Sequence, residues 1–245
     1  MTKAKMKVGI TGASGNIGST LCKGLAAAYD LVLFDIKEPR NANGSRFVPI
    51  DFGEREKLDG LFAGLDAVIH LVGDPRPNAS RQSTMRNNYA ATSYAFEAAK
   101  IAGVKKIVFA SSNFYHEADI GEALSNRSSP RITLDRPPTP QCLYGESKVF
   151  GESIGRHLAY LGMSFVALRI GWSVPGDDPL RYDGAYMRGV YCSHRDLVQA
   201  FDKALQVQTD FLAAFAVSNN GHGVFDLSET RQKLGFIPED DMDAM

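Results

Sequence analysis

The sequence has few cysteines, a single tryptophan, almost no net charge and no long apolar run. Its 245 residues include three cysteines, Cys22, Cys142 and Cys192, which lie far apart along the chain. No pair of them has a metal-ligand or redox spacing, and an odd number argues against a disulfide framework. We therefore expect free thiols in a reducing cytosol.

Other absences exclude whole classes of partner. No apolar run approaches the ~20 residues that span a bilayer, and the basic segment Met1–Lys7 leads into a strand rather than into a signal-type apolar core. The formal net charge of -1 comes from interspersed charges of both signs, which offer no concentrated field to nucleic acid or a membrane surface. No His, Asp and Glu residues cluster at metal-ligand spacing. We expect a cytoplasmic protein with no membrane, nucleic-acid or metal partner.

The sequence does contain a regular alternation of buried strands and helices. Apolar runs predict strands at 7–11, 31–35, 46–51, 67–72, 106–112 and 164–171. Helical spacing predicts helices at 16–28, 54–62, 85–102 and 144–161. This order implies right-handed crossovers and a doubly wound parallel sheet with helices on both faces. The predicted fold class is therefore α/β of the Rossmann type, as a single domain over residues 1–245.

Two irregular stretches interrupt the alternation. Residues 117–141 contain four prolines together with serines and an aspartate, which is the composition of a long loop. Residues 174–184 are also irregular. The chain then finishes with a helix, a strand and a short helix, predicted at 193–207, 211–217 and 228–234. We expect 174–192 and 218–245 to form a small C-terminal appendage that caps the substrate side.

A glycine-rich turn after the first strand is the first candidate binding element. The segment Gly12–Gly18 reads Gly-Ala-Ser-Gly-Asn-Ile-Gly and opens the first predicted helix, which is the context of a dinucleotide-binding turn. Gly12 permits the tight turn, Gly15 lets a pyrophosphate approach the backbone, and Gly18 lets the helix lie close to the sheet. N–H groups at the helix N-terminus then face the phosphates. Cofactor contacts are expected from Gly12, Ser14, Gly15, Asn16, Ile17 and Gly18.

Acidic residues follow two of the predicted strands. Asp35 ends the second strand, where a carboxylate can accept hydrogen bonds from the adenosine ribose. Because a 2′-phosphate there would meet like charge, Asp35 favours NAD over NADP, although Lys37 and Arg40 lie nearby. Asp51 has two interpretations: it binds the adenine amino group, or it caps a helix that begins at Glu54.

A second constellation lies far downstream. Tyr144 and Lys148 are four residues apart on a predicted helix and therefore share a face. A phenol is a poor base near neutral pH, and a nearby ammonium group lowers its pKa by favouring the phenolate. Ser112 ends the fifth strand, at the edge where ligands bind in such sheets. The three residues together predict a proton-transfer group beside a bound dinucleotide.

These motifs together resemble the extended short-chain dehydrogenase/reductases of the NAD-dependent epimerase/dehydratase type. The resemblance also rests on His70-Leu71-Val72-Gly73, Asn88 and Ser111-Ser112-Asn113. Within that group, three segments look most like the uronate dehydrogenases and related NAD-dependent aldose dehydrogenases: Val108–Asn113, Leu143–Lys148 and Leu168–Gly171. Ser193–Asp196 also fits that subgroup.

The resemblance implies a mechanism and further contacts. Tyr144, as phenolate, would remove the proton from the anomeric hydroxyl of a free aldose or uronic acid, while hydride passes to NAD and a lactone forms. Lys148 would also hold the nicotinamide ribose, and Ser112 would position the reacting oxygen. The implied cofactor contacts extend to Asp35, Asp51, Phe52, Leu71, Val72, Gly73, Asn88, Tyr144, Lys148 and Ile170. The implied substrate contacts are Pro75, Ser112, Asn113, Phe114, Trp172, Arg181 and Arg188.

Three positions depart from the uronate dehydrogenase pattern. Asp74-Pro75 stands where those enzymes carry a substrate-binding serine, Phe114 where they have histidine, and Trp172 where they have serine. The arginine that they use for the substrate carboxylate lies in the region of 178–188, where Arg181 and Arg188 are available. The departures bear on the choice of sugar rather than on the fold or the chemistry.

Two other functions fit the same motifs. A sugar epimerase or dehydratase would keep its NAD bound and return the hydride, but the short stretch after the sixth strand, residues 172–245, favours a small, unactivated sugar. A non-catalytic NAD sensor would not need both Tyr144 and Lys148. The resemblance also implies a homodimer whose interface is formed by helices 85–102 and 144–161. His70, at the end of an apolar strand, is expected to have a packing role.

Overall fold

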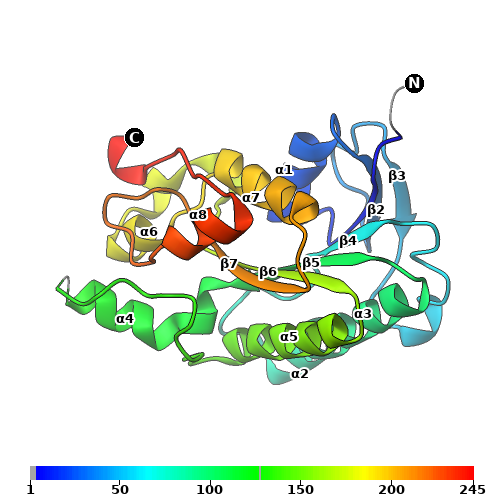
Figure 1. The fold of residues 1–245 in the computed structure, drawn as a ribbon, viewed down its shortest axis with the longest axis horizontal. Helices are drawn as coiled ribbons and strands as arrows, with labels where there is room; N and C mark the ends of the chain where they lie inside the picture. Colours follow the sequence, from blue (N-terminus) through cyan, green and yellow to red (C-terminus); the bar gives the residue numbers. More distant parts are fainter. Residues whose placement is uncertain (1–3, 127) are drawn as a thin grey trace.

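The computed structural model describes residues 4–126 and 128–245, and its centre is a sheet of seven parallel strands (Figure 1). The strand order is β3-β2-β1-β4-β5-β6-β7. The strands are β1 (Lys7–Thr11), β2 (Asp30–Asp35), β3 (Arg46–Pro49), β4 (Ala67–His70), β5 (Lys106–Ser112), β6 (Ser164–Ile170) and β7 (Phe211–Ala216). The chain builds outward from β1 to β3, then crosses back to β4 and builds in the other direction. This is the predicted doubly wound topology, with a switch point between β1 and β4.

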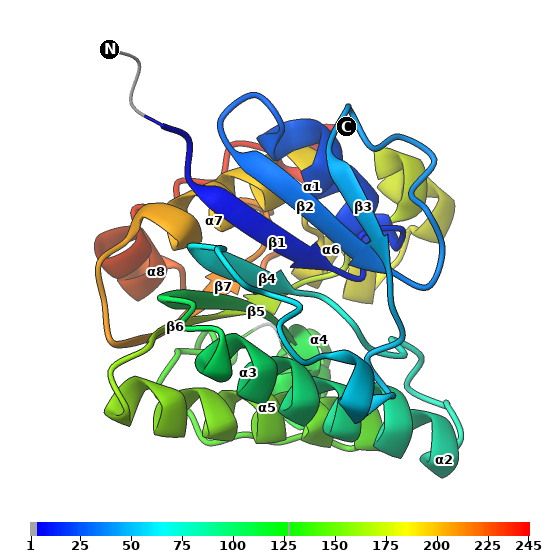
Figure 2. The same cartoon turned by 90° about the vertical axis from the view of Figure 1, so that its right-hand side faces the viewer.

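Helices cover both faces of the sheet. Figure 2 shows α1 and α7 on one face and α3 and α5 on the other. The helices are α1 (Asn16–Leu25), α2 (Arg81–Thr84), α3 (Ala91–Ile101), α4 (Glu117–Ser125), α5 (Leu143–Tyr160), α6 (Ala185–Val190), α7 (His194–Gln206) and α8 (Ser228–Leu234). Each face has its own apolar core, as the apolar character of the strands on both sides predicts.

Strand β5 shows how one sequence serves both cores. Val108 and Ala110 belong to the cluster beneath α1 and α7, whereas Ile107 and Phe109 belong to the cluster beneath α3 and α5. The alternation follows from the period of two along a strand. Every residue of β5 is buried, so its carboxyl end is held rigidly where Ser112 emerges.

Three predicted segments differ from the structure, and one helix was missed. The helix predicted at 54–62 is only a 3₁₀ turn over Arg55–Lys57, and Gly60 adopts a positive φ of 71° that ends regular structure there. The helix predicted at 85–102 starts with a π-helical segment, Met85–Ala90, that continues into α3. Part of the loop predicted at 117–141 is helix α4, because its prolines begin only at residue 130. Helix α6 was not predicted at all.

The two segments expected to form a cap lie against each other. Val174, Met187 and Tyr191 share a small apolar cluster with Met242, and Arg188 Nη1 lies 2.6 Å from Asp243 Oδ1. A second cluster joins α4 and the bridge between Ile132 and Phe225 to this region. The segment after β5 therefore contributes to the same layer as the C-terminal residues.

Candidate active site

The glycine turn has the geometry that its sequence predicts. Gly12 has a φ of 73°, and a Cβ atom there would lie 3.1 Å from the backbone of Leu71 and Val72. The Gly12 N–H donates to the Phe34 carbonyl at 2.8 Å, which ties the turn to β2. Only glycine satisfies both the left-handed conformation and the close approach.

Gly15 and Gly18 have different roles. A Cβ atom on Gly18 would lie 2.3 Å from the Gly12 carbonyl oxygen and 2.7 Å from Ala13, so Gly18 makes room for the turn itself rather than for the sheet. A Cβ atom on Gly15 would meet only the Gly12 carbonyl oxygen, at 3.3 Å. Helix α1 has no side-chain cap and no acidic residue in its first turn. Its free N–H groups are therefore open to a pyrophosphate.

Asp35 lies beside this turn. One carboxylate oxygen accepts the Ser14 N–H at 2.9 Å, and the other accepts the Ile36 N–H at 2.7 Å. These bonds orient the carboxylate at the carboxyl end of β2, where ribose hydroxyls of a dinucleotide can donate to it. The sequence prediction for Asp35 therefore has a matching geometry.

A cavity of about 490 Å³ extends from the glycine turn along the carboxyl ends of β1, β2 and β4. It is lined by Gly12, Ser14, Gly15, Asp35, Ile36, Ile50, Asp51, Phe52, Leu71, Val72, Gly73, Asp74, Pro75, Arg76, Ser83, Arg86 and Asn87. Nine of the predicted cofactor contacts are in this set. Its size, its mixed polar and apolar lining and the oriented carboxylate fit the adenosine half of NAD.

Asp51 does not cap a helix, so that interpretation is wrong. Its carboxylate accepts the Gly53 N–H at 2.8 Å and pairs with Arg86 at 2.7 Å. The hydrogen bond from Arg86 holds the pKa of Asp51 below its usual range. Because Asp51 and its buried neighbour Phe52 both line the cavity, the adenine interpretation is the one that the geometry permits.

Asn88 supports a wall of the cavity and is not among the residues that line it. Its Nδ2 donates to the Asp74 carbonyl at 3.1 Å and to Ser147 Oγ at 3.3 Å, and its Oδ1 accepts the Asp74 N–H at 2.8 Å. Asn88 is buried and joins the loop after β4 to α5. It thus holds the wall of the cavity, and Asp74 and Ser147 are partners that sequence reasoning missed.

Ser112, Tyr144 and Lys148 meet at the carboxyl end of β5. The Lys148 Nζ lies 5.3 Å from the Tyr144 ring centroid and donates to the Ala110 carbonyl at 2.9 Å. Helix α5 approaches the 3₁₀ turn after β5 closely, because a Cβ atom on Gly145 would lie 2.7 Å from the Phe114 carbonyl oxygen. The first turn of α5 therefore brings the phenol to the strand end.

Burial sets the ionisation of this group. It raises the pKa of Tyr144 above its usual value, and hydrogen bonding with Ser112 opposes that rise. Burial also lowers the pKa of Lys148 to about 8. Lys148 is not among the groups that shift the pKa of Tyr144, so the expected lowering by its ammonium group is not seen, and desolvation sets the direction. The positive ring of bound, oxidised nicotinamide would favour the phenolate.

A hydrogen-bonded chain leads from Ser112 to the cap. Ser112 Oγ lies 3.1 Å from Asn113 Oδ1 and accepts the Phe114 N–H at 3.2 Å. Asn113 Nδ2 then donates to the hydroxyl of Tyr186 at 2.6 Å. Phe114 packs edge-on against Tyr144, with ring centroids 5.5 Å apart. Tyr186 was not predicted, because α6 was not.

Trp172 forms an aromatic wall with Tyr182 and Tyr186. Its ring centroid lies 5.2 Å from Tyr182 and 6.1 Å from Tyr186. Trp172 and Tyr182 are exposed, at 38% and 44%. This wall therefore faces solvent and can contact a ligand.

Both arginines expected to bind a substrate anion are already paired. Arg181 lies 2.8 Å from Asp178 and is mostly exposed. Arg188 lies 2.8 Å from Asp183 and 2.6 Å from Asp243. These carboxylates raise the pKa of Arg188 further above its usual value.

A buried ion pair between β6 and α5 supports the end of β5 and the helix that carries Tyr144 and Lys148. Arg169, in β6, contacts both oxygens of Glu152, at 3.0 and 2.9 Å, and Glu152 also accepts the Ser111 hydroxyl at 2.6 Å. Arg169 also bonds His116 at 2.9 Å and lies over the ring of Tyr115. Glu152 is two helical turns beyond Tyr144 on α5. A lone arginine inside an apolar strand was the sequence signal for this network, since such a charge requires a partner.

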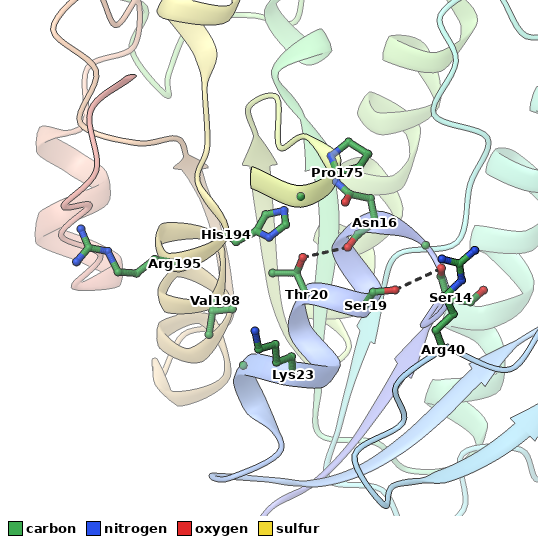
Figure 3. Close-up of a pocket in the computed structure, with 13 residues that line it drawn as sticks. Ser14, Asn16, Ser19, Thr20, Lys23, Arg40, Pro175, His194, Arg195 and Val198 are labelled. Carbon is green, nitrogen blue, oxygen red and sulfur yellow. Dashed lines mark hydrogen bonds between the residues drawn. The ribbon is translucent and has the colours of Figure 1, made fainter. Parts of the chain in front are cut away.

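A second cavity, about 840 Å³, lies on the other side of the glycine turn, between α1 and α7 (Figure 3). Asn16 is at its rim and donates to the Ser173 carbonyl at 2.9 Å. His194 Nε2 lies 2.9 Å from the Val174 carbonyl oxygen. Lys23 and Arg40 also line this cavity. Asn16 therefore links the cofactor turn to the segment after β6.

The surroundings of three further residues named from the sequence are apolar or buried. Ile170 is buried at the end of β6, and Ile17 packs against the core beneath α1. His70 is fully buried between Thr11 and Thr92, at 2.9 and 3.2 Å. Within residues 4–126 and 128–245, no cluster of three metal-ligating side chains is found. No described helix is long and apolar enough to cross a membrane.

Comparison with known proteins decides the family. Residues 8–175 match the model of the NAD dependent epimerase/dehydratase family. The chain belongs to this family. This confirms the predicted family and its NAD cofactor.

Curated relatives are similar over nearly their whole length. L-arabinose 1-dehydrogenase (NAD(P)(+)) of Haloferax volcanii is 30% identical, over 96% of this chain and 96% of its own. The NAD-dependent glucose-6-phosphate dehydrogenase of the same organism is 31% identical, over 94% and 92%. Uronate dehydrogenase of Pseudomonas putida is 29% identical, over 94% and 83%.

A solved structure agrees with the fold. A mutant uronate dehydrogenase from Agrobacterium tumefaciens complexed with NAD is 26% identical, with a TM-score of 0.82 over 98% of this chain and 87% of that one. The prediction of a Rossmann-type α/β fold is confirmed. The prediction of an NAD-dependent dehydrogenase is confirmed by the relatives as a group.

Proposed function

We propose that this protein oxidises the anomeric hydroxyl of a free sugar to a lactone, with NAD as the hydride acceptor. The observation that carries the proposal is the meeting of Ser112, Tyr144 and Lys148 at the carboxyl end of β5, the strand next to β4, whose carboxyl end borders the cavity of the glycine turn. The names of the relatives support it, because arabinose, glucose 6-phosphate and uronates are all sugars with an oxidisable anomeric carbon.

Each of the three residues has a separable task. Tyr144, as phenolate, accepts the proton of the substrate hydroxyl, and Ser112 holds the same oxygen by a hydrogen bond. Lys148 uses one N–H on the Ala110 carbonyl, which leaves two for the ribose hydroxyls of the cofactor. Bound NAD supplies the acceptor for the hydride that leaves the anomeric carbon. One sugar and one NAD⁺ thus give one lactone, one NADH and one proton.

The test is net NADH formation. Purified protein is mixed with NAD⁺ and a panel of free aldoses and uronic acids, and absorbance of NADH is followed together with lactone by chromatography. We expect one NADH per lactone with at least one sugar. Sugar interconversion without net NADH would instead identify an epimerase that retains its cofactor, and absence of any turnover across the panel would overturn the proposal.

We also propose a homodimer through residues 85–102 and 144–161. Exposed apolar side chains on these helices and just beyond them support it: Met85, Ile101 and Leu161 are 43%, 67% and 46% exposed. Light scattering should give twice the chain mass, and Leu161→Glu should give the monomer. A monomeric wild-type protein would contradict the proposal.

Two further proposals concern setting and substrate access. We propose a cytoplasmic location, which the three free cysteines support because they suit a reducing compartment. We propose that 174–192 and 218–245 cap the substrate, which the position of Tyr186 opposite Asn113 supports. Fractionation of cells and protection of α6 from proteolysis by sugar would test them.

A further inference from the structure

Hydroxyl and amide groups line the substrate side of the site. Ser112, Asn113 and Tyr186 form a continuous hydrogen-bonded chain, and its last link is the 2.6 Å bond from Asn113 to Tyr186. In the part of the chain that the structure describes, the hydrogen bonds of these three side chains are with one another or with backbone groups, and none involves an arginine or lysine. Tyr144 adjoins this chain, because burial raises its pKa and hydrogen bonding with Ser112 lowers it. Neutral donors and acceptors of this kind match sugar hydroxyls.

The geometry of α6 turns its cation away from the site. Tyr186 and Arg188 are two residues apart, so their side chains leave the helix about 200° apart. The face that presents the Tyr186 phenol to Asn113 therefore turns Arg188 to the opposite side, where Asp183 and Asp243 hold it. Releasing Arg188 to a substrate would leave these carboxylates without their partner.

The other nearby arginines are also engaged. Arg181 is held by Asp178. Arg76 contacts both oxygens of Asp74, at 2.9 and 2.6 Å, and Asp74 is buried and also accepts the Ser83 hydroxyl. Of the described arginines, Arg76, Arg181 and Arg188 are all paired with carboxylates, so none of the three is free for a substrate carboxylate or phosphate beside Asn113 and Tyr186. Desolvating an unpaired anion is costly.

An aromatic surface completes the pocket. The ring of Trp172 lies next to that of Tyr186, whose hydroxyl bonds Asn113, and Trp172 is partly open to solvent. Aromatic rings pack on apolar C–H faces, while polar groups at the edge fix orientation. A sugar ring offers both kinds of surface.

We propose that the substrate is an uncharged aldose rather than a uronate or sugar phosphate, and that Tyr186 with Asn113 reads its ring hydroxyls. The inference rests on the proposed function and names its substrate class. The reaction is the one given above: the anomeric C–H bond breaks as hydride moves to NAD⁺, the hydroxyl proton passes to Tyr144, and the aldose becomes its lactone.

Matched substrate pairs test this directly. NADH formation is measured with D-galactose against D-galacturonate, D-glucose against D-glucuronate and D-glucose against D-glucose 6-phosphate, with L-arabinose as a neutral sugar lacking a sixth carbon. We expect kcat/KM for a neutral member to exceed that of its charged counterpart by about tenfold or more, since a site built around hydroxyl groups discriminates strongly. A higher kcat/KM for a charged member overturns the inference and leaves the proposed function standing. No turnover of any sugar overturns both.

Two variants locate the specificity. Tyr186→Phe keeps the ring and removes one hydroxyl, so KM for the neutral sugar should rise about threefold to tenfold with little change in kcat and an unchanged Kd for NAD. Tyr160→Phe is the matched control, because this exposed tyrosine lies about 24 Å along α5 from Tyr144; it should leave both constants unchanged. An unchanged KM in Tyr186→Phe would overturn the assignment of Tyr186.

Arg188→Gln distinguishes the alternative in which that arginine binds an anion. Its removal will loosen α6, so the readout is the ratio of kcat/KM for galacturonate to that for galactose. We expect this ratio to change by less than about twofold, because the variant changes no direct contact to either sugar. A tenfold selective loss with galacturonate would show that Arg188 binds the carboxylate and would overturn the inference.

Discussion

The cofactor side and the substrate side of the crevice are built in different ways. On the cofactor side, the groups that matter are close in the chain: Ser14 bonds Asp35 across one strand–helix–strand unit. On the substrate side, Asn113 meets Tyr186 at a separation of 73 residues, and Arg188 meets Asp243 at 55. Local motifs thus specify one half, and long-range pairing specifies the other. A motif search recognises the first half and leaves the substrate unresolved.

The largest expected effect lies where the two sides meet. In Tyr144→Phe the proton acceptor is removed, so kcat should fall by about 10² to 10⁴, the usual contribution of a positioned acid or base. The Kd for NAD, measured by fluorescence titration, should stay nearly the same because the ring remains in place. Activity close to that of the wild type would contradict the role of Tyr144.

Breaking the buried ion pair between Arg169 and Glu152 should mainly lower the free energy of unfolding rather than the catalytic rate. Glu152→Gln leaves Arg169 buried without a countercharge, which costs about 3–5 kcal/mol of folding free energy. Urea unfolding measures the loss. Arg55→Gln is the control, because its pairs with Asp59 and Glu97 are exposed; its unfolding midpoint should hardly move. Equal losses of unfolding free energy in the two variants would contradict a larger contribution from the buried pair.

Acid should weaken the fold through two buried histidines. Burial lowers the pKa of His70 to about 3 and, with the charge of Arg169, that of His116 to about 4. Their unfolded pKa is about 6.5, so the unfolded chain binds more protons below that pH. Their full contribution to stability is present above pH 6.5 and is lost as the pH falls toward 4.

Between pH 7 and pH 5.5 the two histidines together should cost about 2–3 kcal/mol. Urea unfolding at both pH values measures this change. His70→Gln should lower stability at pH 7 yet reduce the slope with pH, because the titrating group is gone. An unchanged slope in the variant would contradict the assignment to His70.

The smallest expected effect concerns the choice of cofactor. Asp35→Asn weakens the charged hydrogen bonds to the ribose, so the Kd for NAD should rise about tenfold. Affinity for NADP should fall less or improve, because the carboxylate no longer repels a 2′-phosphate. Asp30→Asn, at the other end of β2, is the control and should alter neither Kd. A preserved NAD preference in Asp35→Asn would move the selectivity to another group.

Much of the nucleotide half was predictable because its signals are local. Gly12 needs a positive φ, and Asp35 ends a strand at a known distance from the turn, so neighbouring residues suffice to identify both. The wrong or missed elements lie elsewhere. Prolines after residue 130 concealed α4, and a six-residue helix such as α6 has too short a pattern to detect. Tyr186 was missed with it.

Sequence order alone determined the alternating strands, the crossovers and the positions of Ser112, Tyr144 and Lys148, because strand and helix periods and a four-residue helical spacing are short-range properties. The tertiary structure decided which charged side chains are paired with one another and which are free to bind a ligand. Whether Arg188 serves a substrate or an aspartate 55 residues away depends on how α6 is rotated against the C-terminal segment. Such rotation results from packing between distant elements, and no spacing in the sequence records it.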